Sequence, residues 1–161
     1  MGLDVIALSA AMKISDLKED PNFEHSKKYF DVIPAPNCSW NDGITAGKYV
    51  SPQEHFHFYA GSYSSCDHFR LLLFMSANKI SQDDIYSHPD KYQGLPFSQL
   101  VYPLMDTGVF GPTTSLSLFK MFVKYQDFAK QVLGNPGHYL VYLNFTSAFR
   151  IASNNGMVIL Y

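Results

Sequence analysis

The stretch His55-Phe-His-Phe-Tyr-Ala-Gly-Ser-Tyr-Ser-Ser-Cys-Asp-His-Phe-Arg70 decides how the chain is interpreted, because a strand pattern in it runs directly into a helix pattern. From Glu54 to Ala60 apolar side chains alternate with histidine and tyrosine, the period of a strand with one buried face. From Ser64 to Ala77 apolar side chains recur every three or four residues, which predicts an amphipathic helix with Ser64 or Ser65 as its N-cap. The sequence therefore predicts a strand, a glycine turn and a helix in direct succession.

The start of this predicted helix has the chemistry of an anion site. A helix that begins among serines directs unpaired backbone N–H groups, hydroxyls and the positive end of its dipole toward one place. Such a place suits an anion, and a phosphate above all. An ordinary strand-to-helix connection has the same cap without any ligand, so a purely structural role is the alternative. The residues of this stretch predicted to bind a ligand are His55, His57, Tyr59, Gly61, Ser62, Tyr63, Ser64, Ser65 and Arg70.

A second helix start is added to the predicted site. Pro112 suits the first position of a helix, and Thr113 and Thr114 follow it in the first turn. Hydroxyls at the two helix starts would bind phosphates, while aromatic rings, including the only tryptophan, Trp40, would stack on a purine. Packing in the core is the alternative role for these rings. The predicted ligand site therefore also includes Trp40, Thr113 and Thr114.

His55 and His57 point to the same side of the predicted strand, which also suits metal binding or acid–base catalysis. A zinc site has three or four ligands, and no further histidine or carboxylate follows at a recognised hydrolase spacing. The glycine-rich loops of nucleotide-binding enzymes, G-x-x-x-x-G-K-[ST] and G-x-G-x-x-G, are both missing. We therefore expect neither a metal nor a cofactor.

Composition favours one cytosolic domain, residues 1–161. The chain is 47% hydrophobic and 16% aromatic, and a chain of this length removes roughly two-thirds of its unfolded surface from water. The net charge of −2 argues against a nucleic-acid partner, since binding to a phosphate backbone depends on an excess of Lys and Arg. The N-terminus lacks a signal pattern and no run of about 18 apolar residues occurs, so we expect neither export nor a membrane partner. Cys38 and Cys66 lack C-x-x-C spacing and are expected to be buried thiols.

The remaining patterns predict an α+β fold. Strands are expected at Leu3–Leu8 and Met157–Tyr161, near the two ends of the chain, within a mainly antiparallel sheet. Apolar periodicity predicts a long helix from Pro112 to Leu133 and a second one through residues 141–154. Because the Gly134–Gly137 loop between them is short, the two should lie antiparallel on one face of the sheet, among three to four helices in all.

Residues 13–47 are expected to form a long loop or lid. The stretch is rich in charge and proline and contains Asn41-Asp42-Gly43, all of which are typical of turns. A loop of this length often carries a binding function, and a disordered insertion is the alternative. A short strand is expected after it at Gly47–Val50, with shorter helices from Ser81 and over Phe97–Leu104.

Short motifs are spread along the whole chain, namely Met1-Gly-Leu-Asp4, Ala60-Gly-Ser-Tyr-Ser64 with Phe69-Arg70, Pro96-Phe97, Gly111-Pro112 and a terminal strand containing Gly156. Together they resemble a family of small uncharacterised proteins encoded by bacteriophages and prophages. In that family an aromatic–Arg pair precedes Ala-Gly-Ser-Tyr-Ser, and an Asn and a Trp follow it. This chain has Phe58-Tyr59 and Cys66-Asp67-His68-Phe69 at those places. The resemblance implies a phage origin and action in the cytoplasm of the bacterial host, without a known activity.

These observations lead to one hypothesis and two alternatives. The leading hypothesis is a phage-encoded, non-catalytic protein that sequesters a small phosphorylated or nucleotide-derived signal, such as a cyclic dinucleotide or an ADP-ribose derivative, to counter bacterial immunity. In the first alternative a phosphodiesterase-like enzyme cleaves such a signal, with His55 or His57 as base and Arg70 stabilising charge. In the second, an aromatic surface binds and inhibits a host protein. The sequence leaves open whether the chain forms a homo-oligomer.

Overall fold

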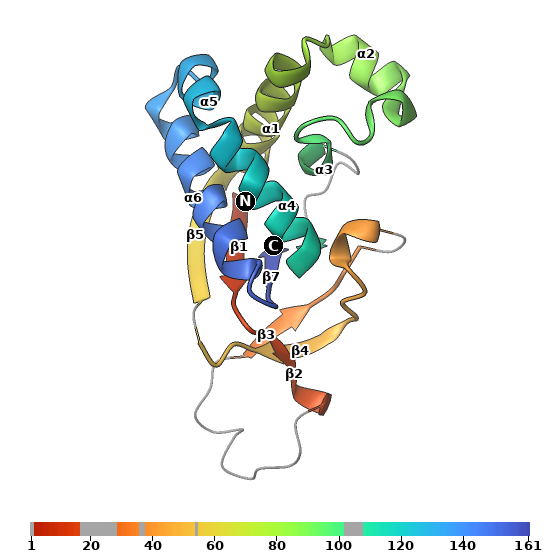
Figure 1. The fold of residues 1–161 in the computed structure, drawn as a ribbon, viewed down its shortest axis with the longest axis vertical. Coiled ribbons are helices and arrows are strands. Elements are labelled where there is room, and N and C mark those ends of the chain that lie inside the picture. Colours follow the sequence, from red (N-terminus) through yellow and green to blue (C-terminus); the bar gives the residue numbers. More distant parts are fainter. Residues whose placement is uncertain (1, 17–28, 36–37, 54, 102–107) are drawn as a thin grey trace.

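A four-stranded antiparallel sheet forms the centre of the computed structural model (Figure 1). The model describes residues 2–16, 29–35, 38–53, 55–101 and 108–161. The strand order is β5 (His55–Ser62), β1 (Gly2–Leu8), β7 (Met157–Leu160) and β6 (Gly108–Phe110). The predicted strands near the two ends of the chain are confirmed, and they are neighbours because β7 pairs antiparallel with β1.

A second sheet packs against one face of the first. Its strands, in the order β2 (Met12–Lys13), β4 (Gly47–Val50) and β3 (Tyr29–Val32), are antiparallel. The strand predicted at Gly47–Val50 is therefore confirmed. Side chains from both sheets form one buried apolar layer, which consists of Leu8, Phe30, Val32, Tyr49, Val109, Met157 and Ile159.

The stretch predicted to be a long loop or lid, residues 13–47, is not a loop throughout. It contains β3 and two 3-10 helices, η1 (Ile14–Asp16) and η2 (Ser39–Asn41). Phe30 and Val32 of β3 are buried between the sheets, so this part of the stretch belongs to the core. Residues 17–28 and 36–37 lie outside the described residues.

Helices cover the opposite face of the central sheet. α4 (Pro112–Lys124) and α6 (Pro136–Ala152) form the predicted antiparallel pair (Figure 1). The rings of Phe122 on α4 and Tyr142 on α6 stack with centroids 4.6 Å apart, and the Tyr142 hydroxyl donates to the Phe122 carbonyl oxygen at 2.5 Å. Burial disfavours the phenolate and raises the pKa of Tyr142. This aromatic contact fixes the two helices to each other.

The helix predicted from Pro112 to Leu133 is in fact two helices. α4 ends at Lys124, Tyr125 has φ −98° and ψ 11°, and α5 (Gln126–Val132) follows. The Tyr125 ring packs edge-on against Phe97, with centroids 5.3 Å apart. The apolar pattern continues across the break because α5 also buries one side, so periodicity alone did not reveal the break.

The connection between β5 and β6 is mostly helical. α1 (Tyr63–Asn78) begins directly where β5 ends, and Phe69, Leu73 and Phe74 on its inner side are fully buried. The shorter helices that follow are α2 (Gln82–Ser87), η3 (Pro89–Tyr92) and α3 (Ser98–Val101).

Both short helices predicted in this connection are present among the described residues. The Ser81 side chain caps α2 by accepting a hydrogen bond from the Asp84 N–H at 3.2 Å. α3 lies within the helix predicted over Phe97–Leu104, and residues 102–107 lie outside the described residues. Within the described part of the chain, every helix is too short or too polar to cross a lipid bilayer.

Candidate functional site

The junction between β5 and α1 is one edge of the candidate site. Gly61 has φ +103° and lies where the register between β1 and β5 shifts, so β5 bulges at this glycine. The Ser62 hydroxyl accepts a hydrogen bond from the Ser65 N–H at 3.2 Å, which makes Ser62 the N-cap of α1. The prediction of Ser64 or Ser65 as N-cap is wrong, because the bulge interrupts the alternation while Ser62 still pairs with Gly2.

The start of α1 presents hydroxyl groups to solvent. Ser62 and Ser64 are exposed, and their Oγ atoms lie 3.2 Å apart. The adjacent Tyr63 and Ser65 are half-buried. No acidic residue occupies the first turn of α1, so the positive end of its dipole is not offset by a carboxylate of that turn.

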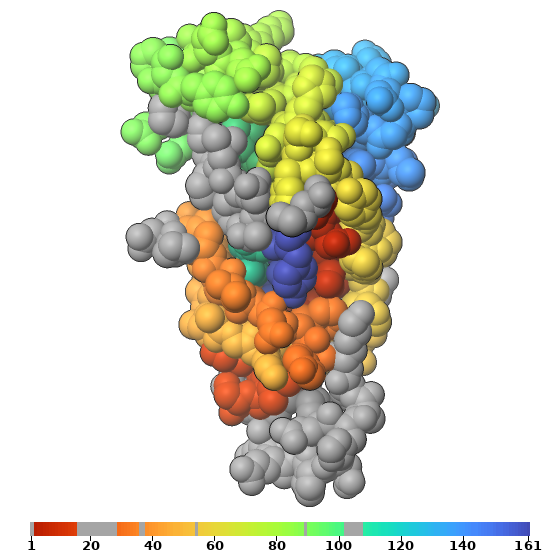
Figure 2. Space-filling view, turned by 180° about the vertical axis from the view of Figure 1, so that it is seen from behind, coloured from red at the N-terminus to blue at the C-terminus, as the bar shows by residue number. Residues whose placement is uncertain are grey.

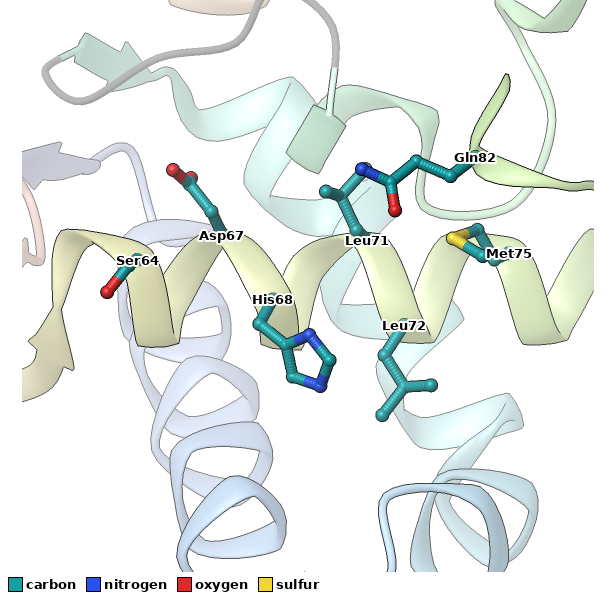
Figure 3. A pocket seen from close by; sticks show the side chains of 7 residues that line it. All are labelled: Ser64, Asp67, His68, Leu71, Leu72, Met75 and Gln82. Atoms are coloured by element: carbon teal, nitrogen blue, oxygen red, sulfur yellow. The ribbon is translucent and has the colours of Figure 1, made fainter. Parts of the chain in front are cut away.

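A hollow of about 330 Å³ runs along α1 from this start (Figure 3). The lining residues recur at three- and four-residue steps, which places them on one side of the helix. Figure 3 shows Asp67 and Leu71 on one flank of α1 and His68 and Leu72 on the other. Polar groups stand at the Ser64 end, apolar groups follow, and the side chain of Gln82 lies beside these apolar groups. The complete lining is Ser64, Asp67, His68, Leu71, Leu72, Met75 and Gln82.

Arg70 does not line the hollow, although it was predicted to bind the ligand. Its side chain is buried, with 5% of the residue exposed, and its guanidinium forms an ion pair with Asp67. Arg70 follows Phe69 on the inner side of α1, away from the exposed surface of the helix. The pair neutralises the one carboxylate in the hollow and leaves the wall without a net negative charge.

A histidine contact joins the hollow to α6. His68 is exposed in the hollow, and its ring lies beside that of His138 on α6, with centroids 5.7 Å apart. His138 also contacts Phe69, with centroids 6.3 Å apart. This contact fixes the side of α1 on which the His68 imidazole lies.

The outward face of β5 carries the three residues expected there. His55, His57 and Tyr59 are exposed, while of the residues that alternate with them Phe56 is half-buried and Phe58 and Ala60 are buried. His57 Nε2 lies 2.9 Å from Asp4 Oδ1 on β1. Among the residues that the structure describes, no group of three or more His, Cys, Asp or Glu side chains could hold a metal ion.

Tyr161 connects this face of the central sheet to the second sheet. Its backbone exchanges hydrogen bonds with the backbone of Asp4, at 2.9 and 3.2 Å, and its hydroxyl donates to the Asp31 carbonyl oxygen at 2.7 Å. Burial raises the pKa of Tyr161, and the Asp31 carboxylate adds to this effect. Figure 2 views this side, where β1 and β7 show between α1 above and the second sheet below.

The start of α4, predicted to bind phosphate, is already occupied by a carboxylate of the chain itself. Asp42 accepts hydrogen bonds from the Thr114 N–H at 2.8 Å and from the Thr114 hydroxyl at 3.1 Å. A negative group at this place satisfies the helix start and opposes a second anion. Thr113 is exposed beside it. The structure therefore does not support a phosphate site at Thr113 and Thr114.

Trp40 packs at this same place instead of lining the hollow. Its ring stacks on Phe110, with centroids 6.3 Å apart, and its carbonyl oxygen accepts a hydrogen bond from the Gly111 N–H at 2.8 Å. A Cβ on Gly111 would lie 2.6 Å from the Asn41 carbonyl oxygen. Glycine thus allows the turn before α4 and the turn around Trp40 to lie in contact.

The two helix starts lie at opposite ends of the central sheet. Ser62, which caps α1, pairs with Gly2, whereas Phe110, just before α4, pairs with Val158, which pairs with Ala7. Gly2 and Ala7 are about 16 Å apart along β1 at the usual rise of a strand. The prediction that both helix starts share one ligand is therefore wrong.

Sequence reasoning missed two features of these sites. It did not predict that Asp42 would bind Thr114, which lies 72 positions away in the chain. It also did not predict that Leu71, Leu72 and Met75 form the apolar part of the hollow. The run Leu71-Leu-Leu-Phe74 was a signal, because a helix with one buried face does not call for four successive apolar residues.

A scan against protein-family models, a search of curated proteins and a search of solved structures found no match to this chain.

Proposed function

We propose that the protein binds a small phosphorylated or nucleotide-derived molecule, with the phosphate at the start of α1 and the rest of the ligand along the hollow. The observation that carries this proposal is the continuity of the two parts: Ser64 belongs both to the first turn of α1 and to the wall of the hollow. A phosphate at Ser64 would meet backbone N–H groups and hydroxyls. An apolar or aromatic portion would then contact Leu72 and Met75.

The function we propose for this binding is sequestration of a signalling molecule. Taken together with the resemblance to phage proteins, this proposal describes a phage-encoded protein that removes a cyclic dinucleotide or an ADP-ribose derivative from the host cytoplasm. The described site has the features of a binding site, with shape, hydroxyls and apolar surface. A binder of this kind acts by affinity and concentration and requires no reacting group.

Cleavage of the same ligand is a second candidate, favoured by one contact. Asp4 lies 2.9 Å from His57 Nε2 on the exposed face of β5, so a carboxylate orients this imidazole as it does in many acid–base pairs. The predicted partner Arg70 is buried and paired with Asp67, so the exposed histidines do not have it as a charge stabiliser. This leaves sequestration as the better supported function.

Calorimetric titration with cyclic dinucleotides, ADP-ribose derivatives and inorganic phosphate tests the proposal. Ser64→Asp places a negative charge where the phosphate would lie, and it should abolish binding while preserving the fold, since an acidic residue in the first turn stabilises a helix. Thr113→Asp adds the same charge at the start of α4 and should leave binding unchanged. Normal binding by Ser64→Asp would contradict the site.

Mass analysis of the released ligand separates the two candidate functions. After incubation and denaturation of the protein, a sequestering protein returns the ligand at its original mass, whereas an enzyme returns fragments. His57→Ala should then leave the released mass unchanged. Fragments from the wild-type protein, absent with His57→Ala, would establish cleavage in place of sequestration.

A further inference from the structure

The outer edge of β5 is a long strand edge without the usual protection against pairing. β5 spans eight residues, and among the described residues it pairs with β1 alone. Proteins protect such edges with proline, lysine, a bulge or a covering element. From His55 to Tyr59 the strand has no proline or lysine, and its register shift falls beyond this range, between Tyr59 and Ser62.

The other edge of the same sheet differs. β6 has only three residues, and all three are buried. In Figure 2 β5 lies along the right-hand border of the molecule, where no other described element covers it from this side. In the described part of the chain the sheet therefore has one long exposed edge and one short buried edge, and a long exposed edge is a template for pairing with another molecule.

We propose that β5 pairs antiparallel with β5 of a second copy of the chain, forming a continuous eight-stranded sheet about a two-fold axis at His57. With His57 opposite His57 of the second copy, Phe56 lies opposite Phe58 and His55 opposite Tyr59. Every pair then joins like faces of the sheet, as antiparallel pairing requires. Aromatic pairs directly opposite each other stabilise such a ladder.

Charge also favours a second copy as the partner. Between His55 and Ser62 the strand contains no Asp, Glu, Lys or Arg, so pairing with itself brings no permanent like charges together at neutral pH. The isologous arrangement uses one surface twice and closes, so it yields a dimer and not a filament. The dimer would place the His57–Asp4 contacts of the two copies next to each other.

Analytical ultracentrifugation of the full chain and two variants tests this pairing. We expect the wild-type protein to sediment as a dimer. In His57→Lys the new ammonium group lies beside Asp4 within each copy, but two ammonium groups oppose each other at the axis, so the dissociation constant should rise about a hundredfold. Tyr86→Lys, at a similarly exposed position on α2, should leave the dimer unchanged.

Disulfide trapping tests the register. His57→Cys should form a cross-linked dimer under mild oxidation, because facing Cα atoms in an antiparallel pair lie within disulfide reach. Tyr86→Cys should stay uncrosslinked. A monomeric wild-type protein, or a His57→Lys dimer of unchanged affinity, would overturn the proposal, and so would failure of His57→Cys to cross-link in a dimer.

Discussion

The starts of α1 and α4 look alike in sequence but differ in the structure. Each follows a strand, each contains a glycine and hydroxyl side chains, and each was predicted to bind phosphate. At α4 the carboxylate of Asp42 accepts hydrogen bonds from the backbone and side chain of Thr114. At α1 the cap is the Ser62 hydroxyl, and the neighbouring Ser64 opens onto the hollow.

The difference shows that a helix start defines an anion site only when the rest of the fold leaves it open. The dipole and the N–H groups are present at both starts, because they come from the helix itself. What decides their use is whether another segment supplies a carboxylate. Asp42 does so at α4, from a turn far away in the sequence.

The largest effect on stability should come from Gly111→Ala, which would disrupt the contact between the Asp42 turn and the start of α4. A Cβ at this position lies 2.5 Å from the Asp42 Cβ and 2.6 Å from the Asn41 carbonyl oxygen, so the turn that carries Asp42 must move. We expect a loss of about 2–3 kcal/mol in the free energy of unfolding, measured with denaturant. Gly137→Ala, in the first turn of α6, is the control and should have a much smaller effect, because a Cβ there would meet only the side-chain Oδ1 of Asn135, at 3.1 Å. Equal stability of both variants would show that the Asp42 turn is not packed on α4.

Removal of the carboxylate should have the next largest effect. Asp42→Ala leaves the Thr114 N–H and hydroxyl without their partner, so stability should fall by about 1–2 kcal/mol. Asp127→Ala, which removes an exposed carboxylate from the first turn of α5, should cost only a few tenths of that. Thermal and denaturant unfolding compare the two variants. A loss of the same size in both would mean that the Asp42 contact contributes no more than general helix-dipole electrostatics.

Ser62→Ala should lower stability by about 1 kcal/mol, because the Ser65 N–H loses the only side-chain cap found at the start of α1 among the described residues. Ser62→Asp restores an acceptor at the same position and should recover most of this loss. Equilibrium unfolding of the two variants provides the measurement. If neither variant differs from wild type, Ser62 is not the cap.

The smallest effect on folding is expected for Ser64→Ala. Ser64 is exposed and its hydroxyl contacts only that of Ser62 in the described structure, so stability should change by less than about 0.5 kcal/mol. Ligand affinity should nevertheless fall about fivefold, the effect of losing one hydrogen bond. Calorimetry and unfolding on the same preparation separate the two quantities. A stability loss as large as that of Ser62→Ala would place the cap at Ser64.

Much of the fold could be predicted, because its signals are local. The alternation from His55 to Ala60 predicted β5 and its exposed face, and the apolar segments near the two ends of the chain predicted β1 and β7. The break at Tyr125 was missed because the apolar period continues through it. The burial of Arg70 was missed because it depends on how α1 packs on the rest of the fold, whereas its pairing with Asp67, three positions earlier on the same helix, is local.

The sequence by itself determined several of the strands and helices, among them β1, β5, β7, α1 and α6, since side-chain periodicity and capping residues act over a few neighbours. Only the tertiary structure decided which helix start remains open, since that depends on contacts between residues far apart in the chain. Thr114 and Asp42 meet across 72 positions, and no local pattern encodes such a contact. The same reason explains why β5 could be recognised as a strand from its residues, while its place at the edge of the sheet could not.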